Sequence, residues 1–297
     1  MSSFRIVKLI RECCNCFNVI IPFRAHSAGT QVCLGANGIV AGKLAELGPV
    51  DPSAISPFNP IMNPQGNPAD PRNRKPVKVE DVQAYLNFAE ERVGLISEKD
   101  KLEVFKLLVS TIEPLALGNL NRGYNDIRFL ARHLLELHMD KSTELEKIDE
   151  IVKQLTEVYT HEFIITRDVA ENIGLNVIRP DAKTEELIMN LFEIYERELK
   201  MNDPFDAENI LTSIQPPNRP VNFKMKLGFI ESESMGYTFI AEGTVFPPAQ
   251  IPQMRITPSG QVPLPMSPPS ATQVPTVRLK TGKWIKILGD PEEEEYA

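Results

Sequence analysis

The chain has 297 residues, 42% hydrophobic and 24% charged, which is typical of a globular protein with one large domain or two. Its net charge of −8 argues against a protein that coats nucleic acid, because such a protein needs a basic face to neutralise phosphates. No apolar run approaches the roughly 20 residues of a membrane-spanning helix. We therefore expect neither a nucleic-acid partner nor a membrane span.

The N-terminal segment predicts an amphipathic helix over 4–17 and not a secretory signal. Arg5, Lys8 and Arg11 interrupt the uncharged core that a signal peptide requires. All four cysteines lie at or before Cys33, which does not fit a disulfide framework spread along the chain. We interpret them as small buried thiols in a reducing environment and expect a cytoplasmic protein.

Short apolar runs alternate with helical patterns over the first two thirds of the chain. Residues 19–23 and 38–41 predict buried parallel strands, and 175–178 predicts a further strand. Another helix is expected to begin at Ser97, with Asp100 completing a capping box. The remaining helices are expected over 31–36, 78–93, 115–139, 143–159, 166–173 and 183–200. This alternation favours an α/β fold with a parallel sheet.

Two regions differ from this pattern. Residues 48–78 are rich in proline without periodicity, which indicates a functional or disordered loop. After residue 214 the chain becomes proline-rich, so we expect one domain over 1–214 and a C-terminal region over 215–297. In that region we expect a β-hairpin over 221–230 and 237–246, another strand or hairpin over 277–288 and a disordered linker over 247–275.

Ser27 lies at a predicted strand-to-helix junction and is followed by the small residues Ala28 and Gly29. Such a junction presents a hydroxyl at the carboxyl edge of a sheet, and the unpaired N–H groups that begin the helix favour an anion. Ser27 is therefore a candidate nucleophile, and the N–H of Ala28 is a candidate oxyanion donor. Taken from these residues alone, the position is more typical of a serine that only caps the helix.

A serine nucleophile needs a base, and the chain has four histidines. His26 adjoins Ser27, but neighbouring side chains on such a turn point apart. His133 and His138 lie on a predicted helix, where an ordinary structural role accounts for them. His161 lies at a junction between a helix and an apolar segment, where functional residues concentrate.

Distinctive motifs follow one another along the chain: His-Ser-Ala-Gly-Thr at 26–30, Leu-Gly-Ala at 34–36, Glu-Leu-Gly-Pro-Val-Asp-Pro at 46–52, Pro-Leu-Ala-Leu-Gly-Asn at 114–119 and Thr-His-Glu-Phe-Ile-Ile-Thr at 160–166. In this order they resemble the serine dehydrogenase proteinase family. That family belongs to the superfamily of the Clp protease proteolytic subunit, signal peptide peptidase A and crotonase. The resemblance implies a Clp/crotonase-like fold, serine endopeptidase activity on a peptide or protein substrate, no metal or organic cofactor, and a homo-oligomer.

The resemblance also implies roles for three residues. Ser27 corresponds to the nucleophile, Asp51 to the triad carboxylate and His161 to the base. By triad logic His161 takes the Ser27 proton and returns it to the leaving amine, while Asp51 orients and stabilises the imidazolium. Taken without the resemblance, Asp51 before Pro52 is interpreted as a turn residue.

Two alternatives stay open. Enzymes similar to signal peptide peptidase A use a Ser–Lys dyad, and Lys75 and Lys78 follow Ser27 at a similar spacing, although within a basic cluster. The family also has an upstream strand and a Pro-Gly-Gly turn that supplies a second oxyanion donor, and no glycine precedes Ser27. Because losing one donor costs about 10²–10³ in rate, this N-terminally incomplete fold is either a peptidase or a non-catalytic interaction protein with a decayed site.

Overall fold

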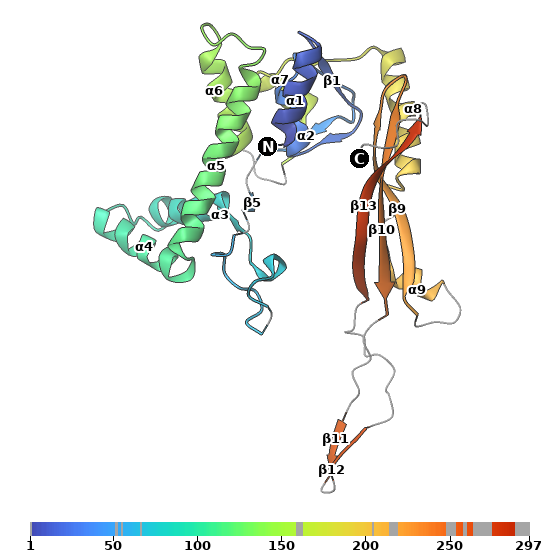
Figure 1. Cartoon of the computed structure of the whole chain (residues 1–297). Coiled ribbons are helices and arrows are strands. Elements are labelled where there is room, and N and C mark those ends of the chain that lie inside the picture. The colour runs from blue at the N-terminus through green and yellow to red at the C-terminus, as the bar shows by residue number, and fades with distance from the viewer. Residues whose placement is uncertain are drawn as a thin grey trace. The chain divides into compact units, whose positions relative to one another are not determined.

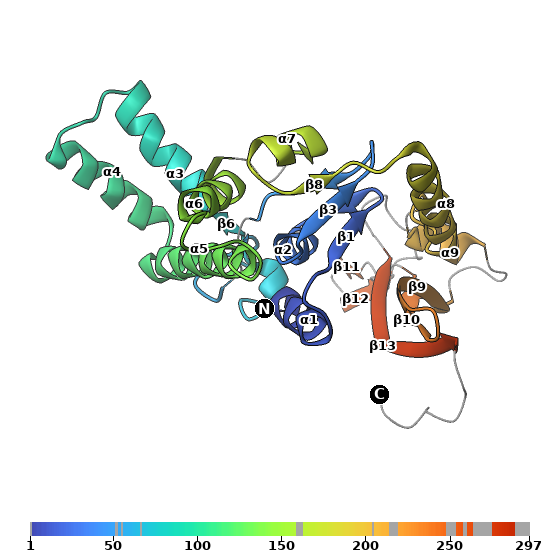
Figure 2. The same ribbon diagram turned by 90° about the horizontal axis from the view of Figure 1, so that it is seen from above.

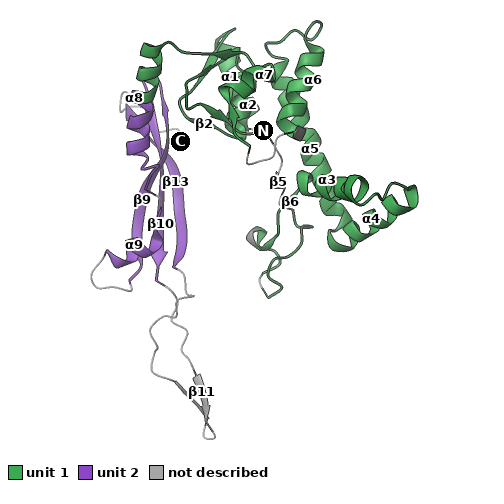
Figure 3. Cartoon of the chain, turned by 180° about the vertical axis from the view of Figure 1, so that it is seen from behind, with its two compact units in different colours: residues 1–189 green, residues 190–297 purple. Residues whose placement is uncertain are grey.

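A computed structural model (Figure 1) describes the chain except for residues 1, 51–52, 55, 66, 159–162, 204, 214–218, 248–253, 258–259, 264–274 and 289–297. The chain forms two compact units, Met1–Met189 and Asn190–Ala297 (Figure 3). The boundary falls within helix α8 (Ala182–Glu198), whereas the change in composition suggested it at 214/215. The second unit therefore begins with helical chain before its proline-rich part.

The first unit is a mixed α/β structure that contains a small parallel sheet. The strand order is β1–β3–β8, with β1 (Asn18–Ile21), β3 (Gly38–Ala41) and β8 (Val177–Ile178). Figure 2 shows these strands side by side, with helices from the N-terminal part of the unit close to them and the helices of residues 79–111 farther away. The three predicted strands are confirmed, but β1 lies at the edge of the sheet. Ile20 is 55% exposed there, whereas Ile21 is 2% exposed and belongs to the core, so the expectation that β1 is buried holds for only one of its faces.

A second sheet of three short strands adjoins the Ser27 region. β2 (Arg24–Ala25) and β4 (Glu46–Leu47) are parallel, and β7 (Ile165–Thr166) pairs antiparallel with β4. The register places Leu47 between Ala25 and Ile165. Because β7 runs in the opposite direction, its first residue lies at the same end of this sheet as the last residues of β2 and β4.

Five helices enclose the core of the first unit: α1 (Ser2–Cys13), α2 (Ala28–Leu34), α5 (Pro114–Leu135), α6 (Leu145–Lys153) and α7 (Arg167–Asn172). The π-helical segment η3 (Gln154–Val158) continues α6. The largest fully buried side chains of this core come from α1, β1, α2, α5, α6, η3 and β7, and include Val7, Ile21, Leu34, Leu134, Leu135, Ile148, Ile151, Leu155 and Ile165. One hydrophobic core therefore joins segments from both ends of the unit.

Helix α1 packs closely against the end of α2, and Gly35 permits this approach. A Cβ atom at Gly35 would lie 2.5 Å from Cγ1 of Val7, a side chain that is completely buried. The helix ends at Cys13, earlier than its apolar spacing predicts.

The cysteines near α1 differ in exposure. Cys13 and Cys16 are exposed, Cys14 is half-buried and Cys33 is buried, and all four are free. The expectation of buried thiols is therefore wrong for the two exposed residues. Burial raises the pKa of the Cys33 thiol to about 12, which keeps it protonated and unreactive.

Helices α3 (Val79–Asn87) and α4 (Glu98–Thr111), joined through the π-helical turn η2 (Phe88–Arg92), lie at the end of α5 that is far from the sheets (Figure 1). The predicted capping box is confirmed, because Ser97 Oγ accepts a hydrogen bond from the Asp100 N–H and the Asp100 carboxylate accepts one from the Ser97 N–H. The apolar side chains whose spacing predicted these two helices are largely exposed on the described chain. No residue of α3 is buried.

The proline-rich segment before α3 is an organised loop. It follows β5 (Ser53–Ala54) and ends at β6 (Val77–Lys78), and these two strands pair antiparallel. Within it the amide of Asn59 donates to the Lys75 carbonyl at 3.0 Å, and Arg74 donates to the Asn59 carbonyl at 2.8 Å. Polar side chains thus satisfy the backbone of a segment that has little regular secondary structure.

The second unit contains a long antiparallel sheet in the order β13–β10–β9, with β9 (Val221–Glu231), β10 (Gly236–Phe246) and β13 (Thr276–Leu288). The predicted hairpin and third strand are confirmed. Helix α9 (Ala207–Thr212) packs Leu211 against Val221 and Val245. Within 247–275 the strands β11 (Met254–Thr257) and β12 (Gly260–Pro263) form a hairpin, and most of the other residues expected to be disordered lie outside the described chain. None of the helices described is both long and apolar enough to span a bilayer.

Candidate functional site

Ser27 occupies a sharp turn between β2 and α2. Its backbone has φ 50° and ψ −107°, a conformation that residues other than glycine rarely adopt. The Gly29 N–H donates to the His26 carbonyl at 2.9 Å, and the Gln31 N–H donates to the Ser27 carbonyl at 3.1 Å. These two hydrogen bonds hold the strained residue at the first turn of the helix.

The Ser27 hydroxyl does not cap α2. Ser27 stands at the N-cap position and is exposed, yet its side chain makes no capping hydrogen bond. The alternative of a simple capping serine is therefore not supported. A serine on a strained strand-to-helix turn with an exposed hydroxyl is the arrangement of the nucleophile in α/β-hydrolases.

Ala28 is the first residue of α2, so its N–H is among those with no acceptor inside the helix. It directly follows Ser27, as the oxyanion donor does in that arrangement. The candidate nucleophile and the candidate oxyanion donor are thus brought together by the same turn.

Thr30 lies beneath this turn and was not singled out by the sequence. It is completely buried, and its Oγ1 is 2.8 Å from the carbonyl oxygens of both Ala25 and Gly48. The ring of His26 also packs against Gly48, where a Cβ atom would lie 3.0 Å from the His26 Cγ. The only feature of the sequence that could have drawn attention to Thr30 is its place at the end of the His-Ser-Ala-Gly-Thr motif.

Asp51 and His161 lie outside the described residues, but the segments on either side of them are described. Val50 precedes Asp51, and its N–H donates to the Leu155 carbonyl at 3.0 Å. Leu155 belongs to η3, which precedes His161, and β7 follows His161. The described chain just before Asp51, which follows β4, is therefore hydrogen-bonded to η3, the helical segment that ends three residues before His161.

The alternative bases lie in different surroundings. Lys78 belongs to β6, where it pairs with Ser53 shortly after Asp51, and it is half-buried. Lys75 is exposed at the end of the proline-rich loop. A lysine acts as a base when burial favours its neutral form, so the exposed position of Lys75 does not fit this role.

The other histidines have structural partners. His133 stacks on Phe129 with ring centroids 4.4 Å apart. His138 Nε2 is 2.9 Å from the Leu34 carbonyl at the C-terminal end of α2, and burial lowers the pKa of its imidazole. Within the part of the chain that is described, no group of three His, Cys, Asp or Glu side chains could hold a metal ion.

A cavity of about 430 Å³ lies beside His138 and is lined by Asn37, Lys147, Glu171 and Asn176. Asn37 and Asn176 directly precede β3 and β8, so the cavity lies at the amino ends of the parallel strands. Ser27 is at the opposite end of α2. The cavity is therefore separate from the candidate nucleophile.

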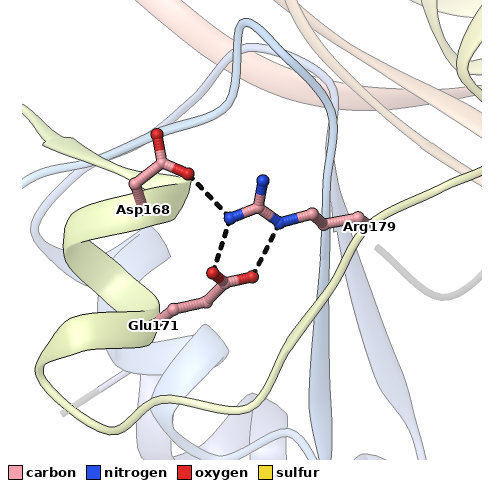
Figure 4. Close-up of polar contacts among 3 residues, drawn as sticks. All are labelled: Asp168, Glu171 and Arg179. Carbon is pink, nitrogen blue, oxygen red and sulfur yellow. Dashed lines mark hydrogen bonds and ion pairs between the residues drawn. The ribbon is translucent and has the colours of Figure 1, made fainter.

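An exposed ion-pair cluster holds α7 in place (Figure 4). Arg179 donates to Glu171 at 2.8 and 2.5 Å and to Asp168 at 2.7 Å. Hydrogen bonding to Arg179 lowers the pKa of the Glu171 carboxyl, so the cluster stays charged at neutral pH. Since α7 directly follows β7 and Arg179 directly follows β8, the cluster links the two small sheets.

No protein-family model matches the chain, and no solved structure matches it. The chain is similar to an uncharacterized protein of Methanocaldococcus jannaschii, with 30% identity over 183 residues. The match covers 61% of this chain and 49% of that protein, so the chain spans about half the length of the curated relative it matches.

Proposed function

We propose that the chain is a serine peptidase with a Clp/crotonase-like fold and that Ser27 is its nucleophile. The observation that carries the proposal is the conformation of Ser27, with φ 50° and ψ −107° at a strand-to-helix turn and a hydroxyl that makes no capping bond. Backbone strain of this kind costs about 1–3 kcal/mol and persists where the surrounding structure enforces it, frequently at active sites. The resemblance of residues 26–30 to the family motif supports the same assignment.

In the proposed reaction the Ser27 hydroxyl attacks the carbonyl carbon of a peptide while His161 takes its proton. The Ala28 N–H donates to the oxyanion of the tetrahedral intermediate. His161 then gives the proton to the leaving amine, an acyl-enzyme remains on Ser27, and water releases the acid by the same steps. The hydrogen bond from Val50 to Leu155 supports a shared site for Asp51 and His161, because it joins the segments that carry them.

A fluorophosphonate probe tests the nucleophile, because it phosphonylates activated serines. The wild-type chain is expected to be labelled at Ser27, and Ser27→Ala is expected to remove the label. Ser142 is another exposed serine of the first unit, so Ser142→Ala serves as a matched control that keeps the label. Labelling that persists in folded Ser27→Ala contradicts the proposal.

The alternative of a non-catalytic interaction protein is favoured by one observation. Large apolar side chains on α3, η2 and α4 are exposed, among them Phe88 at 61%, Phe105 at 49% and Leu107 at 63%. Exposed apolar surface of this extent is typical of interaction sites. We propose that this surface mediates self-association, which is compatible with either function. An assembled protein that no serine probe labels would favour the non-catalytic alternative.

A further inference from the structure

We propose that Thr30 is a positioning residue for Ser27, and that its buried hydroxyl holds the nucleophile turn and the segment leading to Asp51 in register. This inference rests on the proposed function of Ser27.

The first step is the geometry of the hydroxyl. Thr30 Oγ1 is 2.8 Å from the Ala25 carbonyl and 2.8 Å from the Gly48 carbonyl, in a fully buried position. A hydroxyl has one proton to donate, so it serves one of these acceptors at a time while staying within reach of both. The Gly48 N–H also donates to the Ala25 carbonyl at 3.1 Å. Three residues from separate elements thus share one small buried network.

The second step is the position of each acceptor. Ala25 ends β2 immediately before the turn, and Thr30 is in the first turn of α2 just after it, so the hydroxyl spans the base of the turn that carries Ser27. Gly48 directly follows β4, and the chain continues from it through Val50 to Asp51. A single side chain therefore connects the nucleophile turn to the strand that leads to the proposed triad carboxylate.

The third step is the strain at Ser27. A residue other than glycine leaves φ 50° unless the bonds around it enforce that conformation. The backbone bonds of His26 and Ser27 hold the helical side of the turn. The Thr30 hydroxyl supplies the link to the strand side, and valine, which has nearly the same shape but no donor, would remove only this link.

The test compares Thr30→Val with Thr30→Ser, which keeps the hydroxyl. Thr238→Val is a matched control, because Thr238 is also buried and donates to a backbone carbonyl, that of Gly228, in the second unit. The readout is the rate constant for fluorophosphonate labelling at a temperature where circular dichroism shows each variant folded. Thr30→Val is expected to be labelled at least about tenfold more slowly, since a small misplacement of a reacting group costs up to ~10²-fold. Thr30→Ser and Thr238→Val should stay close to the wild-type rate.

A merely structural role predicts a different pattern, in which Thr30→Val lowers thermal stability but reacts at the wild-type rate while folded. That result would overturn the inference. If Thr30→Val does not fold, Thr30→Ala and Thr30→Ser are compared instead, since both lose the methyl group and only serine keeps the donor. Equal labelling rates for these two variants would also overturn it.

The two proposals can fail separately. A wild-type chain that is not labelled at Ser27 contradicts the proposed function, whatever Thr30 does. A labelled wild-type chain with an equally reactive Thr30→Val contradicts only the present inference. A crystal structure of Thr30→Val supplies a readout independent of reactivity: Ser27 is expected to leave its positive φ, and a φ that stays near 50° counts against the role of Thr30.

Discussion

The N–H of Val50 donates to the carbonyl oxygen of Leu155 at 3.0 Å, which joins the chain just before Asp51 to the helical segment just before His161. Val50 and Leu155 are both buried, with 1% and 0% of their surface exposed. A hydrogen bond between buried backbone groups is costly to break, because water cannot replace it. The contact supports the proposed triad of Ser27, Asp51 and His161, which substitution can distinguish from a Ser–Lys dyad.

His161→Ala is expected to abolish labelling of Ser27, because the serine then lacks its base. Rate losses of about 10⁴-fold or more are typical when a triad histidine is removed. Lys78→Ala is expected to keep most of the rate. The measurement is the labelling rate constant of each folded variant. The reverse pattern, with Lys78→Ala inactive and His161→Ala active, would establish the Ser–Lys dyad instead.

Stability is expected to fall as the pH is lowered through about 6.5, in part through His138. Burial lowers the pKa of its imidazole from the ordinary value of 6.5 in the folded protein. The unfolded chain therefore binds a proton at a higher pH than the folded chain, and the contribution is fully present above the unfolded pKa and lost below it. Thermal unfolding of wild type and His138→Gln between pH 8 and about 5 checks this, and the variant should show a weaker dependence. Equal dependence in both would contradict it.

Gly35→Ala is expected to destabilise the first unit by about 1–3 kcal/mol, the usual cost of overpacking. The added methyl would lie 2.5 Å from the buried Val7 side chain. Chemical denaturation of Gly35→Ala, Val7→Ala and the double variant forms a complete cycle. In the double variant the shortened residue 7 should recover part of the loss. Purely additive effects would show that the two positions do not meet.

Replacing the exposed apolar residues of η2 and α4 is expected to reduce self-association. Phe88→Ser and Phe105→Ser together remove two aromatic rings that are 61% and 49% exposed, so neither should unfold the chain. Light scattering after gel filtration gives the mass of wild type and variant. A variant of unchanged mass would rule out this surface as the contact. Leu279→Ser, at a 67% exposed position of β13, controls for the general loss of apolar surface.

Local structure was predictable from the sequence where short-range chemistry decides it. Strand β3 matches its prediction over Gly38–Ala41, because a short run of β-branched residues between glycines is typical of a buried strand. The Ser97 and Asp100 capping box and the β9–β10 hairpin follow from residues close in sequence. The strand-to-helix junction at Ser27 was predicted in the same way, from a strand, a small-residue turn and a helix that follow one another.

Long-range pairing could not be predicted. The two residues of β7 carry no periodic signal, so their antiparallel pairing with β4 is decided by the surrounding core. The role of Thr30 depends on Gly48, which is brought to it only by the folding of β4 beside β2. Exposure was misjudged for Ile20 and Cys13, because periodicity indicates an apolar face but not whether the rest of the chain covers it.

The positive φ of Ser27 has a thermodynamic consequence. Glycine adopts this conformation without strain, so Ser27→Gly should release a net amount on the order of 1 kcal/mol and raise the melting temperature. The natural residue is then the less stable choice at this position. The hydroxyl group at this position is therefore present at a cost in stability, as is common at sites where strain is part of a function.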